Sequence, residues 1–523
     1  MKHDPWLRRA LYLITGCFAL RLIIAATIPL DLVHDEAYYW EWARRLDWCY
    51  YSKPPMVAWL IAASTSLLGD SSFAVRLPAV VLGTWSAWFV FLLARDMYGS
   101  RVGFWAAALL LAAPGSAALG LLMTIDAPLL FCWSVALFAF WRLLQRDRHR
   151  TWWLGCVILA IGIGLLSKQT MLGFIPLAGL FLIASREDRQ ELVRPALWIC
   201  CLVSLCFLAP VVWWNVHNGW VTLEHTSGHF GDESVTIWKR CARGFEFMGA
   251  LSGVASPPTS WLFCFAAAVA LARFPKCGRR ERFLLMFSAI PLIAVTALAF
   301  KQRVEPNWPA PICIAGVIFV SGSVLLTQTR RLVERGKDRR LAIALGTAIV
   351  ATTVTYTLGY GVILKGSKLD AGLRMRGWSQ LGGAAGEVLQ QFPGPDRSFL
   401  VVTNGRAYAS ELAFYMPQHP QAFVWNSSGV VVSQYDVWGG PRGSAGHDAL
   451  IVTDGPEIPQ GLARCFDRIE PLPQVRVPIG NGSQLSVRLW RGVSFDQEVA
   501  IEVAGFGERS RGQYAGKAQP LRR

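Results

Sequence analysis

Apolar segments long enough to cross a membrane recur along the first two-thirds of this 523-residue chain. A helix of roughly 20 apolar residues spans the hydrocarbon core of a bilayer. Short polar stretches rich in Gly, Pro or charged residues separate the segments. The pattern predicts a polytopic α-helical membrane protein with about 11–13 transmembrane helices. The candidate spans are residues 10–30, 73–94, 102–120, 127–144, 152–167, 170–185, 195–214, 259–273, 283–300, 309–327 and 341–364.

The pattern changes after about residue 365, where Gly and polar residues become frequent and short β-rich runs replace the long apolar segments. Residues 398–403 and 449–453 are predicted to be buried strands, and residues 409–416 a helix between them. This order predicts a small α/β domain. We therefore expect a transmembrane domain at 1–364, an α/β domain at 365–506 and a disordered, basic tail at 507–523.

Two segments between these runs have less regular patterns. Residues 53–68 are apolar but too short to span a bilayer, and Pro54 and Pro55 suit the first turn of a helix. We expect this segment to be a helix that lies in the membrane interface. Residues 215–258 contain no continuous apolar run of spanning length, and we expect a long loop there.

Basic residues gather in short loops at alternate ends of the predicted spans. If the N-terminus is cytoplasmic, every strongly basic loop lies in the cytoplasm, as the positive-inside rule requires. These loops lie at residues 95–101, 146–150, 186–194, 276–282 and 330–340. The net charge of +16 therefore reflects membrane topology and does not indicate a nucleic-acid partner. The α/β domain is then expected on the opposite, extracytoplasmic side.

Four groups of polar residues lie on that opposite side. The first is the acidic pair Asp35-Glu36, which the aromatic residues Tyr38 and Tyr39 follow. The second is Asp126, immediately before a predicted span. The third is a set of cations, and the fourth is a polar turn that re-enters the membrane. The cations are Lys53, Arg76, Lys168, Lys301 and Arg303, and the turn contains Glu305, Asn307 and Trp308.

Each of these residues also has an ordinary structural explanation. Asp126 could cap the helix that follows it, with Pro128 in the first turn. Lys168 could extend its ammonium group to the interface, and Arg76 could anchor the entrance of a span. Together, acids and cations on one face suit a reaction on a lipid-linked phosphate. Lys and Arg hold phosphate, and a carboxylate accepts the proton of an attacking hydroxyl.

Six motifs occur in a fixed order along residues 20–320. They are Asp35-Glu36-Ala37-Tyr38-Tyr39-Trp40, Lys53-Pro54-Pro55, Arg76-Leu77-Pro78-Ala79, Met123-Thr124-Ile125-Asp126-Ala127-Pro128, Ser167-Lys168 and Glu305-Pro306-Asn307-Trp308-Pro309. The set resembles the bacterial polyprenyl-phosphate-sugar-dependent glycosyltransferases of the GT-C fold, which include the protein O-mannosyltransferase-like family and the lipid A aminoarabinose transferases. One departure is Ser52-Lys53, where many relatives have Asp-His before the Pro-Pro pair, and it leaves the local metal or substrate contacts open.

The resemblance implies transfer of a sugar from a polyprenyl-phosphate donor to an acceptor hydroxyl at the periplasmic face of the bacterial inner membrane. It implies Asp35 as general base, with inversion at the anomeric carbon. Glu36 and Asp126 would orient the acceptor or bind a divalent cation. Further expected contacts are to the donor phosphate from Lys53, Arg76, Lys168, Lys301 and Arg303, and to substrate from Tyr38, Tyr39, Glu305, Asn307 and Trp308. The acceptor stays open between lipid A, another envelope glycan or lipid, and a protein.

Two alternatives come from other functional classes. A transporter or flippase of lipid-linked sugars would also use charges in a membrane domain, but such proteins often contain internal repeats with paired broken helices. We find no such repeat in the sequence, and the charges collect on one face. A glycan-binding membrane protein without catalytic activity is the other alternative, and the intact acidic pair argues against it only weakly.

Overall fold

The computed structural model describes residues 4–228, 236–326, 334–361, 365–367, 370, 372–503 and 505–506, so the predicted tail at 507–523 lies outside the described residues. The chain forms two compact units. The first unit comprises Met1–Ile28, Lys53–Val212 and Ser227–Thr357. The second comprises Pro29–Ser52, Trp213–Thr226 and Leu358–Arg523. The acidic segment after the first apolar run thus belongs to the same unit as the C-terminal residues. The domain boundaries drawn from the sequence stay predictions.

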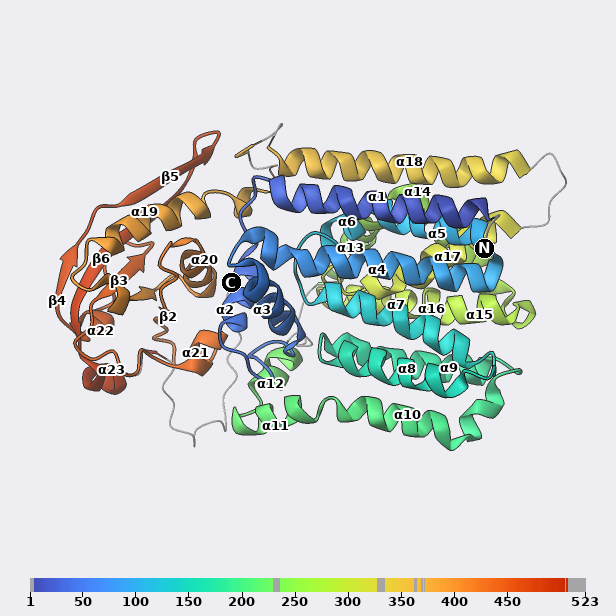
Figure 1. Cartoon of the computed structure of the whole chain (residues 1–523), viewed down its shortest axis with the longest axis horizontal. Coiled ribbons are helices and arrows are strands. Elements are labelled where there is room, and N and C mark those ends of the chain that lie inside the picture. Colours follow the sequence, from blue (N-terminus) through green and yellow to red (C-terminus); the bar gives the residue numbers. More distant parts are fainter. Residues whose placement is uncertain are drawn as a thin grey trace. The chain divides into compact units, whose positions relative to one another are not determined.

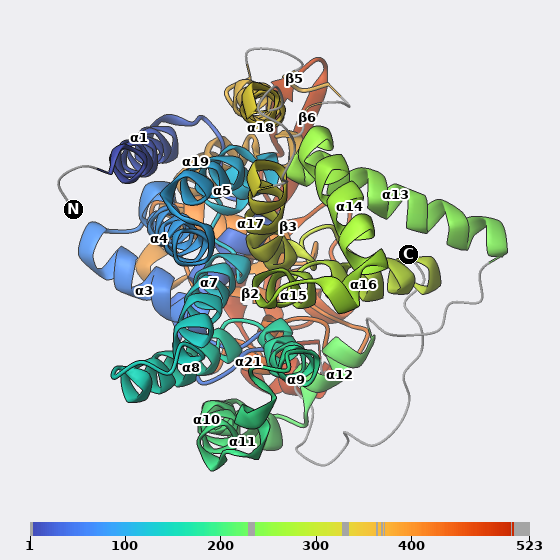
Figure 2. The same cartoon turned by 90° about the vertical axis from the view of Figure 1, so that its right-hand side faces the viewer.

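The first unit is a bundle in which most helices run alongside one another (Figure 1), and many of them are seen nearly end-on in Figure 2. Helices satisfy their own backbone hydrogen bonds, which a lipid environment requires. The helices are α1 (Pro5–Thr27), α3 (Met56–Leu68), α4 (Ser72–Tyr98), α5 (Ser100–Ala112), α6 (Pro114–Leu119), α7 (Asp126–Leu143), α8 (Arg150–Leu165), α9 (Phe174–Ala184), α10 (Pro195–Cys206), α13 (Ile237–Ala255), α14 (Pro257–Ala272), α15 (Arg279–Met286), α16 (Ala289–Lys301), α17 (Ala310–Leu326) and α18 (Glu334–Gly359). Helix α11 (Ala209–His217) passes from this unit into the second.

Every predicted span coincides with a helix or with a consecutive pair of helices. Within the described residues, six helical segments are long and apolar enough to cross a membrane, and shorter apolar helices accompany them. The six are Pro5–Thr27, Ser72–Tyr98, Asp126–Leu143, Pro195–His217, Arg279–Lys301 and Arg339–Gly359. The chain is therefore a multi-pass membrane protein, as predicted.

Close packing between aromatic side chains holds the bundle together. The ring of Phe287 lies 4.9 Å from that of Phe174 and 5.0 Å from that of Phe283, between centroids. Such pairs contribute about 0.5–1.5 kcal/mol each beyond the burial of their area. Helices α4 and α5 pack directly against each other where Gly103 faces Phe91 without a side chain between them. A Cβ atom on Gly103 would lie 2.9 Å from the Phe91 carbonyl oxygen.

A charge inside the bundle has a structural role. Arg21 of α1 is 3% exposed and donates to the carbonyl oxygens of Leu111 and Ser116, at 3.3 and 3.1 Å. These carbonyls flank Pro114, which separates α5 from α6. A cation at a helix C-terminus satisfies free carbonyl groups and interacts favourably with the helix dipole. Arg21 thus stabilises the break between α5 and α6.

Two segments show where the sequence patterns were informative and where they were not. The predicted helix at 53–68 is confirmed as α3, which is too short to span a membrane. The prediction of one long loop at 215–258 is wrong, because α12 (Val221–Gly228) and α13 lie there. Charged residues such as Lys239 and Glu246 interrupt the apolar positions of α13, so it contains no continuous apolar run. Helices α13 and α14 meet at an angle of 111°.

The second unit contains the predicted α/β fold. Its helices are α2 (His34–Ala43), α12, α19 (Trp378–Gln390), α20 (Arg406–Tyr415), α21 (Gln434–Trp438), α22 (Gln460–Ala463) and α23 (Gln497–Val503), and its strands are β1 (Phe399–Val402), β2 (Ala422–Val424), β3 (Ala449–Thr453), β4 (Phe466–Pro471), β5 (Val475–Gly480) and β6 (Ser483–Phe495). The sheet order is β2-β1-β3-β6-β4, and β5 also pairs with β6. Strand β1 is parallel to β2 and β3, and β6 is antiparallel to its neighbours. Strands β1 and β3 are buried along their whole length, which explains their continuous apolar sequences.

Candidate functional site

Asp126, Lys168 and Asn307 form a buried polar cluster in the first unit. The Lys168 Nζ atom donates to Asp126 Oδ1 at 2.7 Å, and Asn307 Nδ2 donates to Asp126 Oδ2 at 2.8 Å. Asp126 is 1% exposed and Lys168 is 8% exposed. Three residues that the sequence nominated from separate motifs therefore meet at one carboxylate.

Local backbone structure places each member of this cluster. Asp126 is the first residue of α7, where the helix dipole favours a negative charge. Lys168 follows the last turn of α8, and its backbone N–H donates to the carbonyl of Gly164 at 3.0 Å. Asn307 lies in the turn between α16 and α17, and its carbonyl accepts from Ala310 at 3.1 Å. The ends of three helical segments thus supply the cluster.

The cluster can hold an anion as well as stabilise the fold. A lysine ammonium has three N–H donors, and the described contacts of Lys168 use one of them, for Asp126. The remaining donors can bind a phosphate oxygen while the carboxylate stays paired. The pairing with Asp126 also replaces the explanation that Lys168 extends to the membrane surface.

The other predicted phosphate ligands lie in different surroundings. Arg76 is 1% exposed inside α4, and Lys53 is half-buried before α3. Lys301 is exposed at the end of α16, and Arg303 pairs with the exposed Glu305 at 3.3 Å. No contact recorded among the described residues joins Lys301 or Arg303 to the Asp126 carboxylate. Trp308 packs half-buried against a cluster that contains Phe247, Ala299 and Val304. The functional roles of all these residues stay predictions.

Asp35 forms a second polar site, within the second unit. Its Oδ1 atom lies 3.2 Å from Arg406 Nη2, and the two side chains are 47% and 45% exposed. The Arg406 guanidinium also lies over the ring of Tyr38, 4.7 Å from its centroid. Helix α2, which carries Asp35, packs against α20, which Arg406 begins. The acid proposed as general base is therefore reachable from solvent and paired with a cation.

The residues beside Asp35 are built into the second unit. Glu36 is fully buried and accepts from the backbone N–H of Val33 at 3.0 Å, as a cap of α2. Tyr38 is 1% exposed, its hydroxyl accepts from the N–H of Gln434, and its ring stacks on that of Tyr435. Tyr39 is also buried. These contacts give the three residues structural roles, while their predicted substrate contacts stay predictions.

Charged groups of both signs lie around the N-terminus of α2. The first turn carries Asp35 and Glu36, and the Oε1 atom of Glu411 lies 3.1 Å from His34 Nδ1. Burial lowers the pKa of His34 below its ordinary value, and the nearby Arg374 and Arg406 act in the same direction, against the opposite effect of Asp35. The lowered pKa favours the neutral form of His34, and Arg406 is the cation that pairs with Asp35.

Sequence reasoning missed Arg406, which lies 371 residues after Asp35 in the chain. One local signal was present. Arg406 is the first residue of α20, where the helix dipole disfavours a cation. A residue that conflicts with local preference often serves a function or a tertiary contact.

The carboxylates do not gather into a metal site. Within the described part of the chain, no group of three or more His, Cys, Asp or Glu side chains could hold a metal ion. Both oxygens of Asp126 accept from Lys168 and Asn307, and Glu36 caps a helix. The carboxylates of Asp126 and Glu36 therefore do not form the oxygen cage that a divalent cation requires. We assign no step to a metal.

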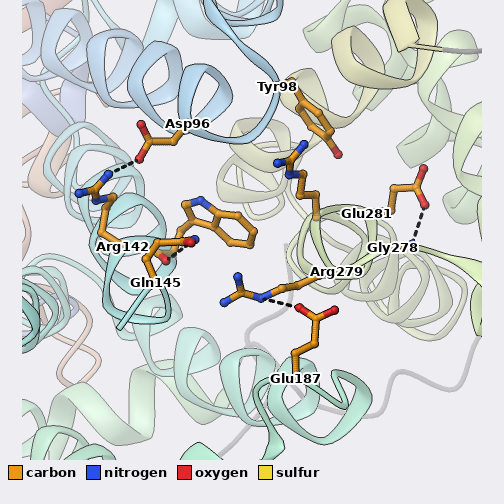
Figure 3. A pocket seen from close by; sticks show the side chains of 10 residues that line it. Asp96, Tyr98, Arg142, Gln145, Glu187, Gly278, Arg279 and Glu281 are labelled. Atoms are coloured by element: carbon orange, nitrogen blue, oxygen red, sulfur yellow. Dashed lines mark hydrogen bonds and ion pairs between the residues drawn. The ribbon is translucent and has the colours of Figure 1, made fainter. Parts of the chain in front are cut away.

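A cavity of about 650 Å³ lies at the other end of α7 from Asp126, within the first unit, and Figure 3 shows the side chains that line it. Its lining includes Asp96, Trp141, Arg142, Glu187 and Arg279, and none of the residues nominated from the sequence. An 18-residue helix such as α7 is about 27 Å long, so this cavity is separate from the Asp126 cluster.

Comparisons with known proteins agree with this fold. Residues 52–214 match the family described as dolichyl-phosphate-mannose-protein mannosyltransferase. The chain is 30% identical over 321 residues to lipid A galacturonosyltransferase RgtD of Rhizobium johnstonii, across 60% of this chain and 64% of that protein. It is 29% identical over 162 residues, or 30% of each protein, to the undecaprenyl phosphate-alpha-4-amino-4-deoxy-L-arabinose arabinosyl transferase of Pseudomonas aeruginosa. The crystal structure of ArnT from Cupriavidus metallidurans bound to undecaprenyl phosphate superposes with a TM-score of 0.61 at 18% identity, over 93% of this chain and 98% of that one.

The chain has the GT-C fold. The predicted fold class and the predicted resemblance to this group of membrane enzymes are both confirmed. The region that matches the family includes Lys53, Arg76, Asp126 and Lys168 of this GT-C chain. Because the match to RgtD covers 64% of the length of that relative, its reaction is carried over only as a proposal.

Proposed function

We propose that this GT-C protein is an inverting glycosyltransferase that moves a sugar from a polyprenyl-phosphate donor to a hydroxyl group of lipid A. The observation that carries the proposal is the buried cluster of Asp126, Lys168 and Asn307. Inside a membrane bundle, this cluster fixes the Lys168 ammonium group, which can bind a phosphate oxygen. Similarity to a lipid A galacturonosyltransferase and to an arabinosyl transferase supports the reaction class and the acceptor.

The reaction needs one base and stabilisation of one leaving group. Asp35 accepts the proton of the acceptor hydroxyl as its oxygen attacks the anomeric carbon from the face opposite the phosphate. The bond between that carbon and the phosphate oxygen breaks, and its electron pair stays on the phosphate. Lys168 stabilises the negative charge that develops there, as a cation fixed in advance by Asp126. A single displacement of this kind inverts the anomeric centre.

The active face is proposed to be periplasmic, in the inner membrane of a bacterium. The basic loops support this orientation, because they alternate with the loops that carry the acids. Polyprenyl-phosphate sugars can serve as donors on this face, where nucleotide sugars are absent.

The donor sugar is proposed to carry a carboxylate. Arg406 places a guanidinium beside Asp35, at 3.2 Å from its Oδ1 atom. A guanidinium has five N–H donors in a planar fork that fits a carboxylate, so Arg406 can bind a uronate while it contacts Asp35. The name of the galacturonosyl relative supports the same sugar class.

The test is an assay with the purified full-length chain, lipid A and polyprenyl-phosphate donors that carry either a uronic acid or a neutral hexose. We expect covalent transfer of the uronic acid, detected as a mass increase of lipid A. Movement of donor between leaflets without a new product would favour the transporter alternative, and binding alone would favour the inactive glycan-binding alternative. Transfer to a protein hydroxyl but not to lipid A would replace the proposed acceptor.

A further inference from the structure

His34 is the first residue of α2 and immediately precedes the acid proposed as general base. Its Nδ1 atom lies 3.1 Å from the Oε1 atom of Glu411, which belongs to α20. Helix α20 packs against both α2 and α19 within the second unit (Figure 1). The His34 side chain is 32% exposed and that of Glu411 is 0% exposed. The pair therefore joins an imidazole that solvent reaches to an acid that is fully enclosed.

Two contacts fix the orientation of the His34 imidazole. Besides the contact with Glu411, the ring of Trp378 meets the imidazole edge-on, with 5.4 Å between the ring centroids. Trp378 is itself held in place. Its indole N–H donates to the carbonyl oxygen of Arg374 at 3.0 Å, and its backbone N–H donates to Asp31 Oδ2 at 2.8 Å. A group that recognises a substrate needs this kind of support from its neighbours.

The contact with Glu411 gives the two ring nitrogens of His34 different roles. An ionised carboxylate only accepts hydrogen bonds, so it keeps a proton on Nδ1. Nε2 is then the acceptor of the neutral imidazole, the form that burial favours by lowering the pKa of His34. The N-terminus of α2 also disfavours a cation. Among the described residues, no recorded hydrogen bond uses Nε2.

A purely structural link between α2 and α20 does not need a buried acid. Trp40 of α2 already packs edge-on against Phe414 of α20, with 4.9 Å between the ring centroids, and both side chains are buried. Burial of a carboxylate costs free energy, and packed apolar side chains often hold two elements together as well as a buried ionic pair does. A costly polar contact beside a reactive carboxylate is therefore typical of a functional site.

We propose that His34 binds the acceptor sugar, and that its Nε2 atom accepts a hydrogen bond from a second hydroxyl group of that sugar. This role rests on the proposed transfer reaction, in which Asp35 takes the proton of the attacking hydroxyl. Because His34 and Asp35 share the first turn of α2, we assign His34 to the acceptor and not to the donor phosphate. Glu411 is a positioning residue that acts through the imidazole.

Two amide variants separate the role of Nε2 from that of Nδ1. The amide nitrogen of an asparagine can replace Nδ1, so His34→Asn keeps the contact with Glu411 and removes Nε2. We expect its KM for lipid A to rise about tenfold, the loss of one hydrogen bond, while Tm and the Kd of the donor stay unchanged. The longer His34→Gln places its amide near the position of Nε2, so its KM should stay close to that of the wild type while Tm falls.

His447→Asn is the matched control, because His447 is half-buried in the same unit. Among the described residues, no recorded contact joins its side chain to α2, and we expect its KM and Tm to stay unchanged. An unchanged KM in His34→Asn, with losses confined to His34→Gln, would overturn the proposal and leave the pair as a structural link. A weaker donor affinity in place of a higher KM for lipid A would also overturn it.

A second measurement uses the wild-type chain and does not depend on the folding of a variant. Mono-deoxy analogues of the lipid A sugar are offered as acceptors, and one of them should show the same tenfold rise in KM. Equal KM values for all analogues would overturn the role of His34 alone. No transfer to lipid A by the wild-type chain would instead overturn the proposed function, and this role with it.

Discussion

At the scale of single residues, Asp35 and Asp126, both expected at the active site, differ in burial and in hydrogen-bond partners. Asp126 is enclosed and holds two donors, whereas Asp35 is half-exposed and holds one cation. A general base must reach the proton of a substrate, so the geometry favours Asp35 for that role. A fixed charge pair suits Asp126 and Lys168, because it holds a cation ready for a phosphate.

The pair of Asp126 and Lys168 gives a quantitative test. Asp126→Asn and Lys168→Met each leave one charge of the pair buried without its partner, so each should lower the free energy of unfolding by about 3–5 kcal/mol. The double variant should lose clearly less than the sum, because it leaves no unpaired charge. Unfolding in detergent measures all three. Additive losses would contradict a direct interaction between the two side chains.

Asp35 allows a test of catalysis with little risk to folding. Asp35→Asn keeps the size of a half-exposed side chain and removes the proton acceptor, so turnover should fall by about 10²–10⁴-fold while donor affinity changes little. Glu36→Gln is the companion variant, and a milder fall in turnover is expected because Glu36 caps α2. Turnover and donor binding of the purified variants provide the check. Near-normal turnover in Asp35→Asn would rule out Asp35 as the base, and Asp126 would then be the next acid to test.

The sequence placed Asp126, Lys168 and Asn307 on one predicted membrane face, because each begins or ends a helical segment there, and the structure brings their side chains into contact. It could not find Arg406, because only the packing of α20 against α2 brings that residue to Asp35. The sequence also did not show that the Glu36 carboxylate accepts from the backbone N–H of Val33 as a cap of α2. Pairing across hundreds of residues depends on tertiary structure, which periodicity in the sequence does not encode.

At the scale of elements, apolar length decided what could be predicted. All the long apolar runs are helices in the structure. Helix α13 was not predicted, because charged residues interrupt its apolar positions. The break between α5 and α6 was also missed, although Pro114 marks it in the sequence. The carbonyl acceptors at this break are satisfied by Arg21 from another helix, and that compensation was visible only in the structure.

The close approach of α4 and α5 leads to a prediction about two glycines. Gly103→Ala should destabilise the protein by about 1–3 kcal/mol, because the new Cβ atom would press on the Phe91 carbonyl, which cannot rotate away. Gly155→Ala is the control in α8, where nothing lies within 4 Å of the new atom, and it should be neutral or stabilising by up to about 1 kcal/mol. Thermal unfolding of both variants measures the difference. Equal Tm values would mean that the two helices can separate at no cost.

At the scale of the whole molecule, the chain order and the compact units do not coincide. The segment Pro29–Ser52, with its acidic pair, folds with residues that follow Leu358. The α/β fold therefore helps to position the proposed base, because α20 packs against α2, the helix that carries Asp35. The phosphate-binding candidates Asp126 and Lys168 belong to the other unit. The residues proposed for the reaction are thus divided between the two units.

The proposed topology gives the last prediction. A reporter enzyme that is active only after export, fused after Gly377, should be active, because the residues that follow α18 are expected in the periplasm. The same reporter fused after Arg194, in a basic loop at the other end of the predicted spans, should be inactive. A second reporter that requires the cytoplasm should give the reverse pattern at both positions. If Gly377 scores as cytoplasmic, the acids and the α/β fold would lie on the side of the nucleotide sugars. The topology would then no longer support a polyprenyl-phosphate donor. The buried contact of Lys168 with Asp126 would still stabilise the fold.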